Sequence, residues 1–166
     1  MTDIPPMEPA LNAMAQSLRQ WSRNKGPVLM VGIRSGGVWV AERLHAALQL
    51  ESPLGILDIS FYRDDFSRIG MNPKVQPSRL PICVDDRHVI LVDDVLFTGR
   101  TIRAALNELF DYGRPASVRL AVLVDRTGRE LPIGADVVGM TLPLKPHEHI
   151  KLSGPDPLRL VIGEVS

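Results

Sequence analysis

Apolar positions along the chain follow two alternating patterns. Four short apolar runs have the length of buried strands: residues 28–33, 54–62, 89–92 and 117–124. Elsewhere the apolar residues recur at helical spacing, as in Leu11, Met14, Leu18 and Trp21, which share one face of a helix. Strands that alternate with helices predict an α/β fold with a mainly parallel, doubly wound sheet and flanking helices.

Glycines and prolines define the ends of the predicted helices. The first helix ends before the Gly26-Pro27 pair, and a second follows the glycine pair at 36–37 and runs to about residue 50. A third covers residues 101–112, because Gly113 provides a standard stop signal. Three short strands are predicted towards the C-terminus: residues 136–139, 149–152 and 158–165.

One stretch, residues 63–81, has no continuous apolar face and is punctuated by prolines. A polar loop of this length inside a compact domain is usually functional or disordered. We expect a strand followed by a flexible loop within residues 58–80, and we favour a mobile lid over simple disorder.

The composition is that of one globular domain spanning residues 1–166. Hydrophobic residues make up 45% of the chain and charged residues 23%. No apolar run approaches the roughly 20 residues needed to cross a bilayer, so we expect no membrane association. The N-terminus, with Asp3 and early prolines, lacks the pattern of a secretory signal.

Cys83 is the only cysteine, which excludes an intrachain disulfide and favours the cytoplasm. Nineteen basic and nineteen acidic residues cancel, so net charge does not predict nucleic-acid binding.

The strongest chemical signal lies in residues 89–101, VILVDDVLFTGRT. An apolar strand brings Asp93 and Asp94 to its carboxyl end, where open α/β sheets bind ligands. The following turn can bind an anion through backbone amides and threonine hydroxyls; it consists of Leu96, Phe97, Thr98, Gly99, Arg100 and Thr101. Carboxylates suit sugar hydroxyls and amides suit phosphate, so the stretch fits a phosphorylated ribose. The alternative is an ordinary strand, acidic turn and helix cap.

A second candidate loop follows the strand at residues 28–33. Arg34 supplies a permanent positive charge, and Ser35, Gly36 and Gly37 allow the backbone to approach a ligand closely. On its own, this loop is as consistent with a tight connection as with a ligand site.

Residues 89–101 resemble the 13-residue signature of type I phosphoribosyltransferases, which bind 5-phosphoribosyl 1-diphosphate (PRPP). Further segments look like the PyrR family, which joins uracil phosphoribosyltransferase activity to regulation of pyrimidine genes by RNA attenuation in some members. These segments are RNKG at 23–26, DISFYRDD at 58–65, GRP at 113–115, VDR at 124–126 and RELP at 129–132. The resemblance implies that uracil and PRPP are converted to UMP and diphosphate.

The resemblance also implies roles for the candidate residues. Asp93 and Asp94 are expected to hold the ribose hydroxyls, directly or through water bound to Mg²⁺. The turn at 96–101 is expected to bind the 5-phosphate. The diphosphate loop of the family, which often contains a non-proline cis peptide bond, corresponds to Arg34, Ser35, Gly36 and Gly37. Some members carry arginine where Gly36 stands, so one diphosphate contact differs.

The lid and the base site follow from the same resemblance. Arg63 and Asp64 fall where the family has its flexible catalytic loop, and could close over the diphosphate or form a salt bridge at the loop base. Uracil is expected under a small hood built from residues 126–144. There Arg126 either contacts the substrate or caps its strand.

RNA binding and assembly are implied by the family alone. Gly128 and Gly134 stand where some attenuating members carry basic residues, which weakens an RNA-binding surface. Five arginines could form a patch on a homo-oligomer or simply be solvated: Arg19, Arg23, Arg43, Arg119 and Arg129. Two alternatives therefore stay open, a UMP-responsive RNA-binding regulator and a phosphoribosyltransferase for another nucleobase.

Overall fold

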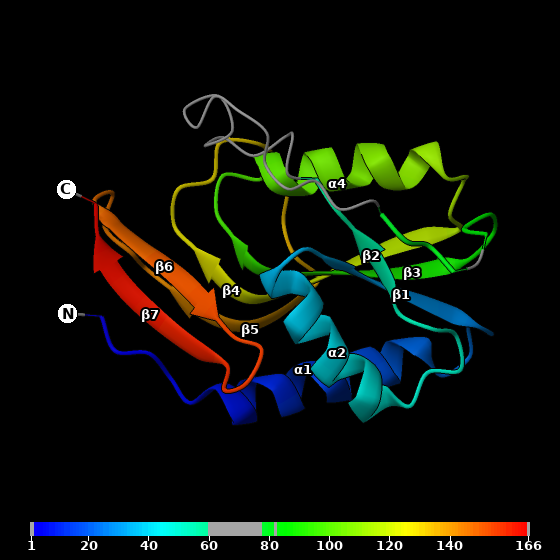
Figure 1. Ribbon diagram of the computed structural model, residues 1–166, viewed down its shortest axis with the longest axis horizontal. Helices are drawn as coiled ribbons and strands as arrows, with labels where there is room; N and C mark the ends of the chain where they lie inside the picture. Colours follow the sequence, from blue (N-terminus) through cyan, green and yellow to red (C-terminus); the bar gives the residue numbers. More distant parts are fainter. Residues whose placement is uncertain (1, 60–77, 82, 166) are drawn as a thin grey trace.

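The structure is a computed structural model that describes residues 2–59, 78–81 and 83–165 (Figure 1). Arg63 and Asp64 lie outside the described residues. The helices of the described part are α1 (Met7–Ser22), α2 (Gly36–Leu48) and α4 (Arg100–Asp111). The strands are β1 (Val28–Ile33), β2 (Gly55–Leu57), β3 (His88–Leu96), β4 (Ser117–Arg126), β5 (Val137–Leu142), β6 (Glu148–Ser153) and β7 (Arg159–Glu164).

Five parallel strands form the main sheet in the order β2-β1-β3-β4-β5. The chain passes from β1 outwards to β2 on one side and from β3 outwards to β4 on the other. The strand order therefore reverses between β1 and β3. In open α/β sheets such a reversal leaves a crevice at the carboxyl ends of the two strands, and ligands bind there. The predicted mainly parallel, doubly wound sheet is confirmed.

Helices cover both faces of this sheet. Successive strand residues point to opposite faces. Met30 and Ile90 accordingly pack in the cluster with α1 and α2, and Val31 and Leu91 in the cluster with α4. Figure 1 shows α1 and α2 on one side of the sheet and α4 on the other. Burial on both faces explains why the central strands are continuous apolar runs rather than alternating ones.

The observed elements differ from the predicted ones mainly at their ends. β3 does not stop at the apolar run but continues through the acidic pair, because Val95 and Leu96 still pair with β4. α2 begins at Gly36, so the glycine pair lies in the first helical turn rather than in the preceding loop. β2 occupies only Gly55–Leu57 of the predicted strand at 54–62, whose last three residues lie outside the described part.

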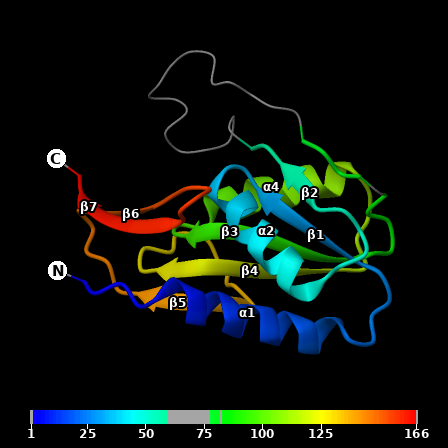
Figure 2. The ribbon, with the colours of Figure 1, turned by 60° about the horizontal axis from the view of Figure 1, so that its bottom comes forward.

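The two C-terminal strands pair with each other and not with the main sheet. β6 and β7 form an antiparallel hairpin, which lies beside the carboxyl ends of β3, β4 and β5 (Figures 1 and 2). Leu152 and Leu158 of this hairpin join the cluster formed with α1 and α2. Part of the predicted 126–144 hood forms β5, which is an edge strand of the main sheet.

Among the helices of the described ranges, none has the length and apolar character needed to cross a membrane.

Candidate active site

The loops after β1 and β3 meet at the crevice where the strand order reverses. α2 starts so close to β3 that a Cβ atom added to Gly37 would lie 2.7 Å from the Val92 carbonyl oxygen and 3.0 Å from Asp93 Cα. A Cβ atom added to Gly36 would overlap the Asp94 carboxylate. The structure therefore brings the predicted diphosphate loop and the acidic pair into direct contact, and only residues without side chains permit this approach.

The two carboxylates of the acidic pair have different surroundings. Asp93 is 1% exposed, and its Oδ1 accepts a hydrogen bond from the Asp94 amide at 2.9 Å. Asp94 is half-buried, and its own Oδ1 accepts from the Val95 amide at 2.9 Å. Val92 and Val95 both pack in the α1–α2 cluster, although residues three apart in a regular strand point to opposite faces. The alternation of β3 thus breaks at the acidic pair, and Asp94 is the carboxylate that solvent and a ligand can reach.

Arg34 is held by a buried carboxylate from the residue that follows the neighbouring strand β2. Its Nε atom lies 3.6 Å from Oδ2 of Asp58, whose side chain is only 1% exposed. The Arg34 amide donates to the Leu57 carbonyl oxygen at 2.9 Å, and the Arg34–Ser35 peptide bond is cis. The ion pair with Asp58 restrains the orientation of the Arg34 side chain. That side chain is 22% exposed, so part of the guanidinium can still meet an anion.

The turn after β3 encloses a small cavity. The cavity has a volume of about 60 Å³ and is lined by Val95, Leu96, Phe97, Thr98, Gly99, Thr101 and Ile102. Gly99 has a positive φ of 96° and precedes the first residue of α4, so the turn leads directly into a helix N-terminus. Partial positive charge and unpaired amides at such an end favour a bound anion. Five of the six residues predicted to bind phosphate line this cavity.

Arg100, the sixth of those residues, points elsewhere. Its guanidinium forms an exposed ion pair with Glu130, with Nη2 and Oε2 3.1 Å apart. Its amide donates to the Thr98 hydroxyl at 3.1 Å. The contribution of Arg100 to anion binding therefore stays a prediction.

Arg126 is a buried cation that joins the main sheet to the C-terminal hairpin. Nη1 donates to the Glu148 carbonyl oxygen at 2.8 Å and Nε to that of Thr127 at 3.1 Å. The guanidinium also lies over the Phe97 ring, with Cζ 4.0 Å from the ring centroid. Burial lowers the pKa of the Arg126 guanidinium, and the Glu148 carboxylate partly offsets this shift. These contacts agree with the strand-capping alternative for Arg126, and its contact with substrate stays a prediction.

Replacing Arg126 by lysine is expected to lower the free energy of unfolding by about 2–3 kcal/mol, because an ammonium group cannot reproduce the planar fork that serves several carbonyl groups. Urea denaturation followed by circular dichroism measures this loss. Arg43→Lys is the matched control, since Arg43 pairs with Glu8 on the surface at 3.0 Å. That exposed pair is expected to contribute about 0.5 kcal/mol or less. Equal losses in the two variants would contradict the structural role of Arg126.

The donor set at the crevice fits a magnesium ion bound together with a phosphorylated substrate. Within the described ranges, no three His, Cys, Asp or Glu side chains gather into a metal site of their own. Mg²⁺ commonly uses only one or two carboxylates, with water and substrate phosphates as its other ligands. The Asp94 carboxylate, lying against Gly36 beside the diphosphate loop, has the chemistry and position for this role.

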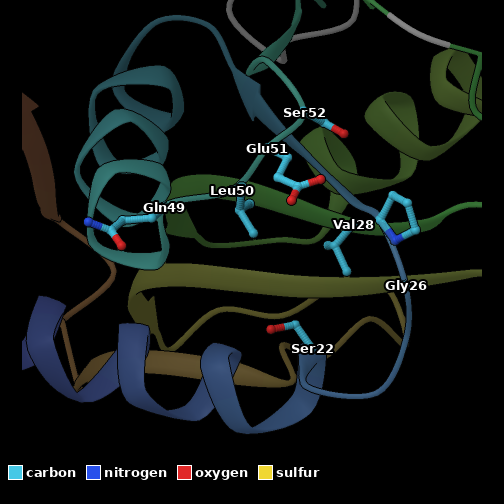
Figure 3. Close-up of a pocket in the computed structure, with 8 residues that line it drawn as sticks. Ser22, Gly26, Val28, Gln49, Leu50, Glu51 and Ser52 are labelled. Atoms are coloured by element: carbon cyan, nitrogen blue, oxygen red, sulfur yellow. The ribbon is translucent and has the colours of Figure 1, made fainter.

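Larger cavities between residues that the structure describes lie away from these side chains. One, of about 360 Å³, lies between the C-terminal ends of α1 and α2, and residues 22, 26–28 and 49–52 line it (Figure 3). It is at the amino ends of the strands, opposite the acidic pair. The other, of about 400 Å³, is an apolar groove between α4 and residues 132–136. Neither is lined by Arg34–Gly37, the acidic pair or residues 96–101, although part of the second is formed by residues of the predicted 126–144 hood.

Two residues of the site were not assigned by sequence reasoning. Asp58 has no predicted role of its own, although an acidic residue at the carboxyl end of an apolar run is a signal for a site residue. Arg129 is part of a family-like segment and of the possible basic patch in the sequence, without a role at the site, but its guanidinium contacts the Phe97 carbonyl oxygen and the Asp125 carboxylate. Nothing in the local sequence indicates the contact with Phe97, because the two residues are 32 positions apart.

Solved structures of similar fold include hypoxanthine phosphoribosyltransferases. A hypoxanthine phosphoribosyltransferase from Trypanosoma cruzi superposes with a TM-score of 0.67 at 23% identity, covering 82% of this chain and 77% of that one. A hypoxanthine phosphoribosyltransferase from Staphylococcus aureus gives a TM-score of 0.65 at 20% identity, covering 84% and 77%. At these identities the likeness establishes the fold.

Sequence comparison identifies the family. The phosphoribosyl transferase domain family matches residues 1–152. The Bifunctional protein PyrR of Nitrosococcus oceani is 64% identical over 149 residues, which cover 89% of this chain and 83% of that protein. The Bifunctional protein PyrR of Pseudomonas syringae pv. tomato is 61% identical over 136 residues, covering 82% and 80%. These matches establish that the chain belongs to the PyrR family of phosphoribosyl transferase domain proteins.

Proposed function

We propose that this chain transfers the phosphoribosyl group of PRPP to uracil, giving UMP and diphosphate. The observation that carries the proposal is the meeting of the acidic pair, the Arg34–Gly37 loop and the anion-binding turn at one crevice. The high identity to proteins named Bifunctional protein PyrR, together with the segments that resemble the PyrR family, supports uracil as the acceptor.

Each part of PRPP has a chemically suited partner in this arrangement. The 5-phosphate would occupy the cavity of about 60 Å³ at the start of α4. The ribose hydroxyls would bind Asp94, with Asp93 holding the backbone behind it. The diphosphate would lie along the first turn of α2 beside Arg34, whose orientation Asp58 restrains.

The acidic pair also has a role in the reaction itself. As the bond between ribose and diphosphate loosens, positive charge grows on the ribose, and a fixed carboxylate beside it stabilises that charge more than it stabilises the ground state. The Asp94 carboxylate is held by the Val95 amide, so little reorganisation is needed when the charge develops. When bound, Mg²⁺ neutralises the negative charge on the departing diphosphate.

The lid and the base site complete the proposal. Arg63 and Asp64 would close over the diphosphate and exclude water. Uracil would lie near residues 126–144, where backbone groups can bind its alternating donors and acceptors. The Arg126 contacts to residues 127 and 148 support a rigid backbone at this place.

Purified protein is expected to form UMP from uracil and PRPP only when Mg²⁺ is present, because the diphosphate charge must be neutralised for departure. Chromatographic detection of UMP, with and without a chelator, measures this dependence. Orotate and hypoxanthine in parallel reactions test the rival substrates. Turnover of either rival base, without turnover of uracil, would contradict the uracil assignment.

A UMP-responsive RNA-binding function stays an alternative. The name of the relatives describes them as bifunctional. However, several arginines of the predicted patch make intramolecular contacts: Arg19 with the Ala47 carbonyl oxygen, Arg43 with Glu8, Arg119 with Asp136 and Arg129 with Asp125. Sequence-specific, UMP-enhanced binding to a pyrimidine-operon leader RNA would support the alternative, and purely salt-sensitive binding would not.

We further propose a homo-oligomer in the cytoplasm. The apolar groove between α4 and residues 132–136, beside Phe110 at 53% exposure, supports an oligomer because such a surface is costly to leave in water. The single cysteine agrees with a reducing compartment. Light scattering after size-exclusion chromatography measures the assembly.

A further inference from the structure

A short segment, residues 128–131, lies directly behind the anion-binding turn. The Arg129 guanidinium donates through Nη1 to the Phe97 carbonyl oxygen. The amides of Glu130 and Leu131 both donate to the Thr98 carbonyl oxygen, at 2.9 and 3.0 Å. Two successive carbonyl groups of the turn are therefore bound from the same side.

These bonds determine where the amides of the turn point. In a trans peptide unit the N–H group points away from the preceding C=O group. The cis bonds of the described chain are at Arg34–Ser35 and before two prolines, so the peptide units of the turn are trans. With the carbonyl groups of Phe97 and Thr98 turned towards residues 129–131, the amides of Thr98 and Gly99 point the opposite way. Both residues line the cavity of about 60 Å³.

Arg129 is itself anchored to a rigid element. Its Nη2 atom lies 2.6 Å from Oδ1 of Asp125, and the two side chains are only 28% and 25% exposed. Asp125 belongs to β4 and pairs in register with Leu96 of β3. A planar guanidinium with several donors can serve a carboxylate and a carbonyl group at once. Arg129 therefore links the turn to the central sheet.

A glycine allows the segment to come this close. Gly128 has a φ of 120°, and a Cβ atom added to it would overlap the Phe97 ring. Residues 128–131 therefore contact the Phe97 side chain of the turn as well as the backbone of the turn.

We propose that Arg129 is a positioning residue for phosphoribosyl transfer: by holding the Phe97 carbonyl group, it directs the amide of Thr98 towards the 5-phosphate of the substrate. This inference rests on the proposed function, which places the 5-phosphate at the turn. Arg129 itself does not touch the substrate. Its effect is on phosphate affinity, with no direct part in the loss of diphosphate.

The experiment compares two ligands that occupy opposite halves of the site. Calorimetric titrations with ribose 5-phosphate and with magnesium diphosphate are made on the unmodified protein, Arg129→Met and Arg129→Lys. We expect Arg129→Met to weaken ribose 5-phosphate binding by about tenfold or more, as for loss of a hydrogen bond made by a charged group, with magnesium diphosphate binding unchanged. Arg129→Lys, which can keep one of the two contacts, is expected to lose less. In steady-state assays the same variants should raise KM for PRPP more than they lower kcat.

Arg43→Met is the matched control, because it removes the guanidinium of an exposed arginine that pairs with Glu8 at 3.0 Å, outside the residues of the proposed site. It is expected to leave both affinities unchanged. Parallel loss of both ligands in Arg129→Met would reveal a general structural role and overturn the inference, as would unchanged ribose 5-phosphate binding. If the unmodified protein binds magnesium diphosphate but not ribose 5-phosphate, the proposed phosphate site fails, and this inference with it.

Discussion

Replacing Asp94 by asparagine is expected to reduce kcat/KM for UMP formation by about 100-fold or more, in the range seen when one preorganised electrostatic group is removed. The substitution removes the negative charge beside the developing ribose cation and weakens the magnesium ligand set. It keeps the shape of the side chain, including the oxygen that accepts from the Val95 amide. The free energy of unfolding should therefore change little. Initial rates with varied PRPP, and urea denaturation of the same samples, measure the two effects.

Asp111→Asn is the control, because it makes the same exchange at a carboxylate outside the site. Asp111 is exposed at the end of α4, so its substitution should leave turnover unchanged. Asp93→Asn is expected to lower both turnover and stability, because its carboxylate is 1% exposed and fixes the Asp94 amide. Full activity in Asp94→Asn would remove the proposed role of the acidic pair.

Replacing Gly37 by alanine is expected to lower the free energy of unfolding by about 2–3 kcal/mol, even though alanine favours a helix by roughly 1 kcal/mol over glycine. The added Cβ atom would meet the Val92 carbonyl oxygen at 2.7 Å and Asp93 Cα at 3.0 Å. Both atoms belong to the backbone of the central strand and cannot move aside. α2 would have to shift away from β3, which would also separate the diphosphate loop from the acidic pair. Denaturation midpoints and UMP formation should therefore fall together.

Two other glycines give controls for this substitution. Gly134→Ala should be close to neutral, since no heavy atom lies within 4 Å of the added Cβ atom. Gly36→Ala should leave the fold intact but lower activity, because the added atom meets the Asp94 carboxylate, which can rotate away from its place. A Gly37→Ala protein as stable as Gly134→Ala would show that α2 and β3 tolerate a wider spacing.

The boundaries of the elements show where local patterns stop being informative. The apolar run at 89–92 indicated a strand that ends at the acidic pair, whereas β3 runs to Leu96. The two aspartates end the apolar run, but the backbone of β3 continues to pair with β4 beyond them, which extends the strand. The C-terminal strands were likewise placed by their apolar residues. Their apolar pattern does not indicate that they form a separate hairpin, which contacts the distant residue Arg126 through the Glu148 carbonyl oxygen.

The site shows the same division between chemistry and orientation. The sequence predicted a crevice ligand site from the acidic pair and the Thr-Gly turn, since these groups carry their chemistry wherever they are placed. It treated Asp93 and Asp94 as equivalent, and only the fold buries one and leaves the other accessible. Arg126 had two open roles, and the tertiary contacts engage its donors with backbone carbonyl groups.

By itself, the sequence determined the fold class and the order of strands and helices along the chain, and it predicted two stretches with the chemistry to bind phosphate and ribose. Hydrophobic periodicity and residue chemistry are local properties, so they follow from the sequence without knowledge of the tertiary structure. The tertiary structure decided how close α2 lies to β3, which carboxylate holds Arg34, and that Arg129 supports the turn from behind. These features join residues far apart in the sequence, and their distances depend on the packing of whole elements against one another.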